Sequence, residues 1–190
     1  RENRSSRGLG DVYKRQGYKW LRGTYGASVG YLSPQAKKLV PGIVGFRSNE
    51  DIWDMRSDRM NLPKDASRFE FTTLHFGALR GLAASIEEML EIGIERIWEH
   101  DLSLSDMVVE LASSRGLEVT SPTDDDQRSA IVSIRPPSEH HSAEIVRRLQ
   151  DEFGILVTDR SGMIRVSPHI DNDHSQIEFL FTSLDKILAN

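Results

Sequence analysis

The sequence predicts an α+β fold for residues 74–190, and three features indicate it. Two long helical patterns of apolar residues open this part of the chain. Short runs rich in Val and Ile follow, bounded by Gly, Pro or Asp, and such runs are typical of strands. A shorter helical pattern comes after each pair of strands, so the order is strand, strand, helix, strand, strand, helix. We expect a mainly antiparallel sheet, because hairpin-like turns suit this order.

The two long helices are predicted from apolar residues that recur every three or four positions. The first begins near Leu74 and stops at Gly93. The second runs over about 94–114, and Gly116 supplies its C-terminal stop. The residues expected to face inward are Leu74, Ala78, Leu79, Leu82, Ile86, Met89 and Leu90 in the first helix, and Ile94, Ile97, Trp98, Leu104, Met107, Val108 and Leu111 in the second.

The shorter elements are placed by their turn residues. The acidic triplet 124–126 lacks the spacing of a calcium loop and is predicted to be a solvated turn. Gly154 closes a helix, and Ser161-Gly162 forms the turn of a hairpin. The expected strands are 117–120, 130–134, 155–158 and 163–167, and the expected helices are 142–153 and 175–188.

Composition excludes several classes of protein. With 190 residues and 38% hydrophobic content, the chain can bury a core of its own. Its net charge of −5, with scattered acids, gives neither a basic face for nucleic acid nor a polybasic membrane anchor. No apolar run has transmembrane length, and the chain has no cysteine, so disulfides and thiolate metal sites are excluded. We expect a cytoplasmic protein.

Residues 1–16 differ from the rest of the chain. They are rich in Arg, contain few apolar residues and show no sustained period. We predict a non-native or disordered tail and leave it out of the fold. The alternative is a basic, flexible N-terminal arm.

The first chemical signal is Lys19, which lies between Tyr18 and Trp20 and precedes a glycine-rich segment and a short apolar strand. Aromatic walls would disfavour the ammonium form and leave a neutral amine able to attack carbonyl carbon, which is the chemistry of a Schiff-base lysine. Glycines at positions 23, 26 and 30 would permit positive φ or close approach of the backbone. The alternative is a lysine whose stem packs beside a core tryptophan while its head stays in water.

The second chemical signal is Arg165, in the middle of a predicted strand between Ile164 and Val166. A guanidinium there needs a partner or an opening to a cleft. Its planar fork of donors suits a bidentate bond to a carboxylate. A structural ion pair is the alternative.

Histidines at 140, 141, 169 and 174 raise the possibility of a zinc site and hence a metal-dependent hydrolase. Neither pair has the i, i+4 spacing of a helical metal pair, and no third ligand is evident. We interpret them as helix-start and loop histidines. Arg128 is expected to be structural, and Arg68 and Glu70 are expected to pair.

Three segments together resemble the class V aminotransferases, the group of fold-type I enzymes that includes cysteine desulfurases and isopenicillin-N-epimerase-like proteins. The segments are GYKWLRGTYGASVGYLS at 17–33, RFEFTT at 68–73 and GMIRVSPH at 162–169. Three departures stand out. The turn at Gly23-Thr24 has no proline, Thr72 replaces the usual glycine, and Asp171-Asn172 replaces Tyr-Asn.

The resemblance implies an enzyme that uses pyridoxal 5'-phosphate (PLP) and acts on an amino acid. Lys19 would hold PLP as a Schiff base, and Arg165 would bind the substrate carboxylate. Thr73 would reach the PLP phosphate of a neighbouring subunit, which implies a homodimer. The chain would be the C-terminal portion of such an enzyme and inactive alone. It would comprise a large-domain remnant with the fold-type I α/β architecture at 17–73, long linking helices at 74–116 and a small α+β domain at 117–190.

The resemblance leaves the reaction open among transamination, racemisation and elimination. A selenocysteine-lyase or epimerase-like enzyme of the same family is one alternative. A non-enzymatic α+β interaction module, in which Lys19 and Arg165 are structural, is another. A desulfurase that forms a persulfide is not expected, because the segment 158–162, where that thiol would lie, has no cysteine.

Overall fold

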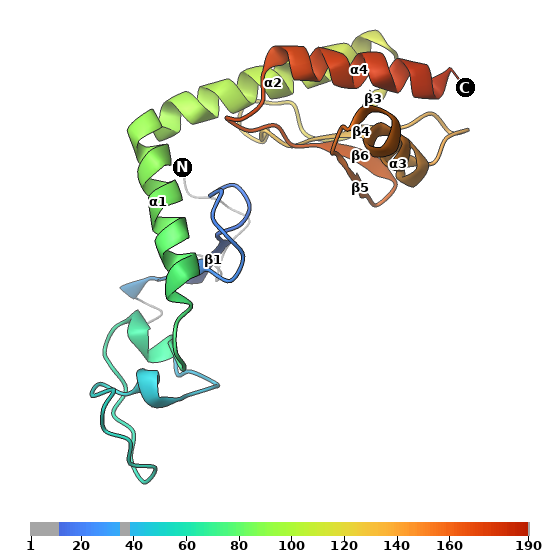
Figure 1. Cartoon of the computed structure of the whole chain (residues 1–190). Coiled ribbons are helices and arrows are strands. Elements are labelled where there is room, and N and C mark those ends of the chain that lie inside the picture. Colours follow the sequence, from blue (N-terminus) through green and yellow to red (C-terminus); the bar gives the residue numbers. More distant parts are fainter. Residues whose placement is uncertain (1–11, 35–38, 190) are drawn as a thin grey trace. The chain divides into compact units, whose positions relative to one another are not determined.

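The computed structural model describes residues 12–34 and 39–189 and divides the chain into two compact units, Arg1–Glu91 and Ile92–Asn190 (Figure 1). The boundary therefore falls inside the segment 74–116, which the sequence predicts to be a separate pair of linking helices. The first long helix belongs to the first unit except for its last residue, and the second long helix belongs to the second unit.

The first unit contains a two-stranded antiparallel ribbon. Strand β1 (Val12–Gln16) pairs with β2 (Ser28–Leu32), with Tyr13 opposite Tyr31. Residues 12–16, which the sequence analysis leaves out of the fold, thus pair with β2, because their backbone satisfies the hydrogen-bonding edge of that strand. That residues 1–16 are a non-native tail stays a prediction. Residues 1–11 lie outside the described part of the chain.

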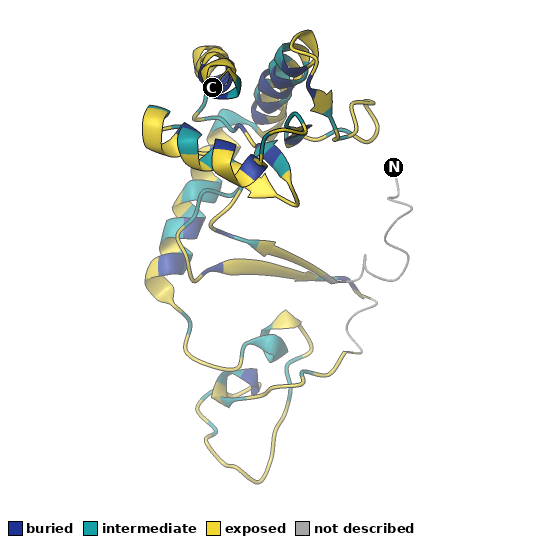
Figure 2. Ribbon diagram, turned by 90° about the vertical axis from the view of Figure 1, so that its right-hand side faces the viewer, coloured by how far each residue is buried: buried dark blue, intermediate teal, exposed yellow. Residues whose placement is uncertain are grey.

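The rest of the first unit is a long connection followed by a helix. Two short 3₁₀ helices, η3 (Phe46–Ser48) and η4 (Ala66–Phe69), interrupt the connection, and α1 (Phe76–Ile92) follows. Most residues between 39 and 73 are exposed or half-buried (Figure 2). The small core of this unit consists of Ala27, Ala78 and Leu82, with Leu21, Leu79 and Ile86 packed against it.

The second unit is an antiparallel sheet with three helices, which confirms the predicted α+β class. The sheet has the strand order β3-β4-β6-β5, and each neighbouring pair is antiparallel. Its elements are α2 (Ile94–Ser114), β3 (Glu118–Val119), β4 (Val132–Arg135), α3 (Ser142–Phe153), β5 (Thr158–Arg160), β6 (Met163–Val166) and α4 (His174–Leu188).

One hydrophobic cluster joins the sheet to all three helices. Buried and less buried residues alternate along the central strands β4 and β6, so one face of each strand is buried while the other is not. The buried members are Leu104, Val108, Ala112, Leu117, Val132, Ile134, Ile145, Leu149, Ile164, Val166, Ile177, Leu180, Phe181, Leu184 and Ile187. Because α2 supplies three of these residues, it packs as part of the second unit.

The buried face of α2 also differs from the prediction. Ile94 and Trp98, expected to face inward, are 39% and 42% exposed. Asp101 is fully buried instead. Ile97, in the first turn of α2, is 1% exposed as predicted, so the buried stripe begins there but does not include Ile94 and Trp98.

Candidate functional site

Lys19 lies in the compact turn that connects β1 to β2. The amide of Arg22 donates to the carbonyl of Lys19 at 2.7 Å, and the amide of Gly23 donates to the carbonyl of Gly17 at 2.8 Å. The amide of Gly17 donates to the carbonyl of Ala27 at 3.1 Å. These bonds close the loop on both sides of the lysine.

Glycine is favoured at three positions of this loop. A Cβ on Gly17 would lie 2.8 Å from the carbonyl oxygen of Ala27, and one on Gly23 would lie 2.8 Å from Cδ1 of Leu82. Gly26 has φ of +92°, which an L side chain rarely adopts. The predicted glycine requirement thus holds at 23 and 26, whereas a Cβ on Gly30 would meet nothing within 4 Å.

The expected aromatic pocket around Lys19 is not formed by the described residues. Lys19 is exposed, and its Nζ lies 5.8 Å from the ring centroid of Tyr18. Tyr18 stacks on Tyr25 at 4.5 Å, and Trp20 has the guanidinium of Arg15 5.3 Å from its ring. Tyr18 thus contacts both Tyr25 and the amine of Lys19, while Trp20 contacts Arg15, so the two aromatic side chains do not enclose the exposed lysine.

Thr73 follows a segment that is anchored by residues from η3. Nη2 of Arg47 lies 3.0 Å from Oε2 of Glu70, and the hydroxyl of Ser48 donates to the carbonyl of Glu70 at 3.1 Å. The predicted Arg68–Glu70 pair is therefore wrong: Glu70 bonds to Arg47, and Arg68 donates to backbone carbonyls.

Thr73 itself is exposed. Within the described residues, no hydrogen bond joins it to Lys19, although both belong to the first unit. Its hydroxyl is therefore accessible to a ligand, and so is the amine of Lys19.

Arg165 lies on β6 of the second unit, opposite Ser133 on β4 and Thr158 on β5. Its neighbours Ile164 and Val166 point into the core, so Arg165 lies on the other face of the sheet. Its Nε is buried and has no hydrogen-bond partner among the described residues. The structure shows no ion pair for Arg165 in the described part of the chain, unlike Arg128, which pairs with Asp106 as a structural residue.

Asp101 and His169 form a contact that the sequence analysis missed. Oδ2 of Asp101 lies 3.4 Å from Nδ1 of His169. His100 donates through Nε2 to the carbonyl of Asn172 at 2.9 Å, so two adjacent α2 residues hold the connection between β6 and α4. A signal was available, because Asp101 lies in register with Ile97, Leu104 and Val108 on the buried stripe.

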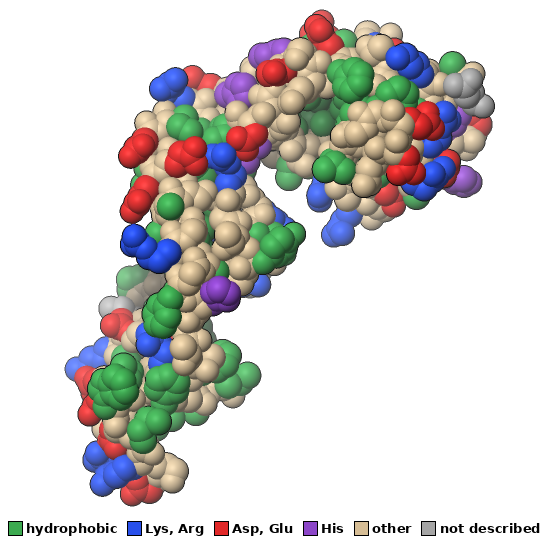
Figure 3. Space-filling model, viewed as in Figure 1, with side chains coloured by type: hydrophobic (Ala, Val, Ile, Leu, Met, Phe, Trp, Pro, Cys, Tyr) green, Lys and Arg blue, Asp and Glu red, His purple; other side chains and the backbone are tan. Residues whose placement is uncertain are grey.

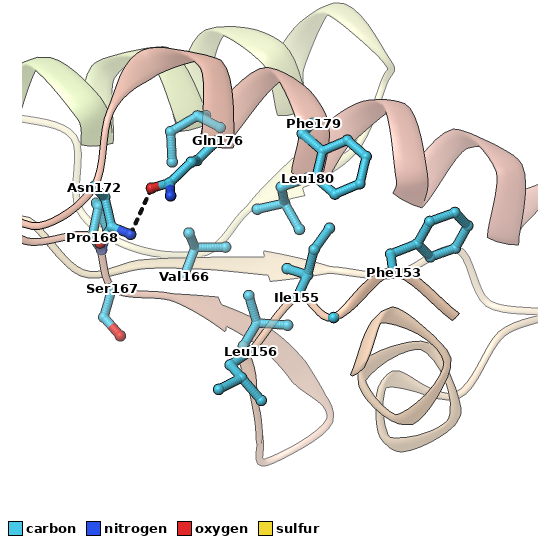
Figure 4. Close-up of a pocket in the computed structure, with 13 residues that line it drawn as sticks. Phe153, Ile155, Leu156, Val166, Ser167, Pro168, Asn172, Gln176, Phe179 and Leu180 are labelled. Atoms are coloured by element: carbon cyan, nitrogen blue, oxygen red, sulfur yellow. Dashed lines mark hydrogen bonds between the residues drawn. The ribbon is translucent and has the colours of Figure 1, made fainter. Parts of the chain in front are cut away.

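A cavity of about 400 Å³ opens on the helix side of the same sheet (Figure 4). Apolar side chains such as Leu156, Val166 and Phe179 line it, and the amide of Asn172 donates to Oε1 of Gln176 at 2.9 Å at one end. Arg165 is not among the lining residues. This cavity is therefore distinct from the site that the sequence predicts.

Large hydrophobic side chains are exposed in the segment 39–76 of the first unit. Trp53 and Met55 are 82% and 72% exposed, and Phe46, Phe71 and Phe76 are exposed as well. Figure 3 shows hydrophobic side chains on the visible face of this part of the chain. Clustered exposed apolar side chains are typical of a surface that another protein covers.

In the described part of the chain, no three His, Asp or Glu residues come together as a metal site would require. None of the described helices is long and apolar enough to cross a membrane.

Comparison with known proteins connects these residues to a family. The family model described as "Aminotransferase class-V" matches residues 11–180. A kynureninase from Geobacillus thermodenitrificans is 27% identical over 158 residues, covering 80% of this chain and 36% of the kynureninase. A probable cysteine desulfurase from Pyrococcus abyssi is 25% identical over 189 residues, and the match covers 92% of this chain and 46% of the desulfurase.

The fold is also found among solved structures. The apo structure of cysteine desulfurase from Thermococcus onnurineus NA1 superposes with a TM-score of 0.83 at 23% identity, covering 94% of this chain and 47% of that one. This chain thus spans less than half the length of these relatives.

Proposed function

Because this chain belongs to the class-V aminotransferase family, we propose that the protein carrying it is a PLP-dependent enzyme that acts on an amino acid through a Schiff base on Lys19. Enzymes of this family use PLP. The observation that carries the proposal is the glycine-closed turn that presents an exposed Lys19 amine. That turn lies within the segment that the family model matches. Its backbone hydrogen bonds hold the main chain on both sides of Lys19.

The described residues suit PLP chemically. The aldehyde of PLP needs an accessible amine to form a Schiff base, and the exposed Lys19 supplies one at the turn. A phosphate requires hydroxyl or amide donors, and the exposed Thr73 hydroxyl is one. When bound, PLP supplies an electron sink for the carbanion that forms at the substrate α-carbon.

The role of Arg165 in the proposal is to bind the α-carboxylate of the substrate. Two parallel N–H···O bonds from a planar guanidinium fix both the position and the orientation of a carboxylate. The missing acidic partner among the described residues supports this role, because a buried guanidinium nitrogen is costly unless it gains an acceptor. Lys19, once its amine is free, moves the proton at the α-carbon as general base and acid.

A homodimer is part of the proposal. The segment that carries Thr73 also carries the exposed Phe71 and Phe76, and Trp53 lies on the connection before it. A second copy covering this surface would bury those side chains and bring Thr73 to the neighbouring cofactor.

The test is reduction of the PLP-supplied, full-length protein with borohydride, followed by peptide mapping. We expect a phosphopyridoxyl adduct on Lys19. The Lys19→Arg variant should lose the adduct, whereas Lys64→Arg, a matched change at another exposed lysine of the first unit, should keep it. A folded, PLP-supplied protein without an adduct on Lys19 would favour the non-enzymatic interaction module.

A further inference from the structure

Two arginines lie on the same face of the β5–β6 hairpin. Ser161 and Gly162, with φ of +54° and +80°, form its two-residue turn. The register places Arg160 opposite Met163 and Thr158 opposite Arg165. Because alternate residues of a strand share a face, Met163 and Arg165 lie on one face, and Arg160 joins them there as a cross-strand neighbour.

These guanidiniums are unusual within the second unit. Arg96, Arg160 and Arg165 have no carboxylate partner among the described residues, and of the three only Arg160 and Arg165 lie on the sheet. The arginines with a carboxylate partner are Arg115, Arg128, Arg135, Arg147 and Arg148.

The surroundings do not neutralise this pair of charges. Arg165 lies between two hydroxyl residues, Ser133 and Thr158. The acid nearest in sequence, Asp159, lies on the opposite face and accepts a hydrogen bond from the hydroxyl of Ser142 at the start of α3. Glu118 lies on the same face at the other edge of the sheet, on β3, and there it is paired with Arg135.

We propose that Arg160 is a specificity-determining residue that binds a second anionic group on the amino-acid substrate while Arg165 binds its α-carboxylate. The inference rests on the proposed function and narrows the substrate to acidic amino acids such as aspartate and glutamate.

The geometry suits such a substrate. Diagonal cross-strand neighbours have Cα atoms about 7–8 Å apart, which is within reach of long side chains. The flexible stems of two arginines can therefore converge on the two carboxylates of one small molecule. Two adjacent cations repel each other when the site is empty, and a ligand with two negative charges relieves that repulsion.

The experiment measures ligand binding to the full-length, PLP-loaded protein by calorimetry and by the change in cofactor absorption. Aspartate and glutamate are compared with their uncharged analogues asparagine and glutamine. We expect the acidic amino acids to bind about 10- to 100-fold more tightly, which is the usual range for a charge-assisted hydrogen-bonded contact. Arg160→Gln should abolish this preference while asparagine and glutamine bind as before.

Arg135→Gln is the matched control, because Arg135 lies on the same sheet but is paired with Glu118. It should retain the preference. An equal affinity of the unmodified protein for acids and amides would overturn the inference, and so would an unchanged preference in Arg160→Gln.

A third titration separates this inference from the proposed function. Succinate and glutarate have two carboxylates but no amine, so they need no cofactor chemistry to bind. If Lys19 forms an adduct but Arg160→Gln binds these dicarboxylates as well as the unmodified protein does, only the specificity inference fails. If Lys19 forms no adduct but the dicarboxylates bind and lose affinity in Arg160→Gln, the anion site stands and the enzymatic proposal fails.

Discussion

Oδ2 of Asp101 lies 3.4 Å from Nδ1 of His169, and the Asp101 side chain is fully buried. The contact joins α2 to the connection between β6 and α4, four residues after Arg165. The amide of Ile170 donates a hydrogen bond to Nδ1 of His169 at 2.8 Å, which also holds the imidazole in place. The carboxylate–imidazole contact therefore fixes the chain just beyond the strand that carries Arg165.

We expect Asp101→Ala to destabilise the protein by about 2–4 kcal/mol, because it removes a buried carboxylate and leaves its neighbours without that partner. Glu110→Ala, an exposed acid on the same helix, should change stability by less than about 0.5 kcal/mol. Urea unfolding of each variant measures the difference. Equal stability of the two variants would show that Asp101 contributes nothing through its burial.

Gly45→Ala should destabilise the first unit. A Cβ on Gly45 would lie 2.0 Å from the carbonyl oxygen of Phe71, so the backbone before Thr73 must move. We expect a loss of about 1–3 kcal/mol, the usual range for overpacking. Gly42→Ala is the control, because a Cβ there meets nothing within 4 Å. Thermal unfolding of the two variants measures the difference. If Gly45→Ala is as stable as Gly42→Ala, the backbone at Gly45 does not lie as close to the carbonyl of Phe71 as the structure shows.

Asp173 makes stability depend on pH in the acid range. Its carboxylate caps α4, and hydrogen bonds from the Ser175 hydroxyl and the Gln176 amide lower its pKa below the ordinary value. A lowered folded pKa stabilises the protein above the unfolded pKa of about 3.9, and the benefit is lost as pH falls through the folded value.

The stability difference between the unmodified protein and Asp173→Asn should therefore be largest above about pH 5 and shrink toward pH 2. Denaturant unfolding at a series of pH values measures it. A difference that grows as the pH falls would mean that the carboxylate is not stabilised by this cap.

Arg165→Lys in the full-length enzyme should raise KM for the amino acid about 10- to 100-fold while PLP binding changes little. A lysine ammonium cannot reproduce two parallel hydrogen bonds, and their loss costs about 1.5–3 kcal/mol. Steady-state kinetics and cofactor titration separate the two effects. Unchanged KM and kcat/KM would remove Arg165 from the substrate site.

No persulfide should form on this part of the enzyme when cysteine is supplied. The chain has no cysteine, and the turn between β5 and β6 carries Ser161 and Gly162 where a thiol would be needed. Elimination that releases the substrate's side-chain group directly, as in a selenocysteine-lyase-like reaction, needs no thiol on the enzyme. Mass spectrometry of the cysteine-treated, full-length enzyme tests this expectation, and a trapped enzyme persulfide would contradict it.

The local elements of the second unit could be predicted because their signals are local. Helix α3 has the predicted bounds, and Gly154 ends it in a left-handed conformation with φ of +70°. The hairpin of β5 and β6 turns at Ser161-Gly162, as the sequence indicates. Periodicity, capping and turn residues determine such features within a few positions, so the antiparallel α+β class followed from them.

Only the tertiary structure decided which residues those elements bring together. Asp101 is fully buried and Trp98 is 42% exposed, the reverse of what their side-chain types suggest, because tertiary contacts decide which residues of α2 are covered. Glu70 bonds to Arg47, which is 23 residues away, rather than to its neighbour Arg68. Arg165 could be singled out from the sequence because it interrupts the apolar strand β6. Its place beside Arg160, and the absence of an acidic partner among the described residues, depend on strand register. Strand register and burial arise from contacts between segments that are distant in the sequence, so local sequence patterns do not determine them.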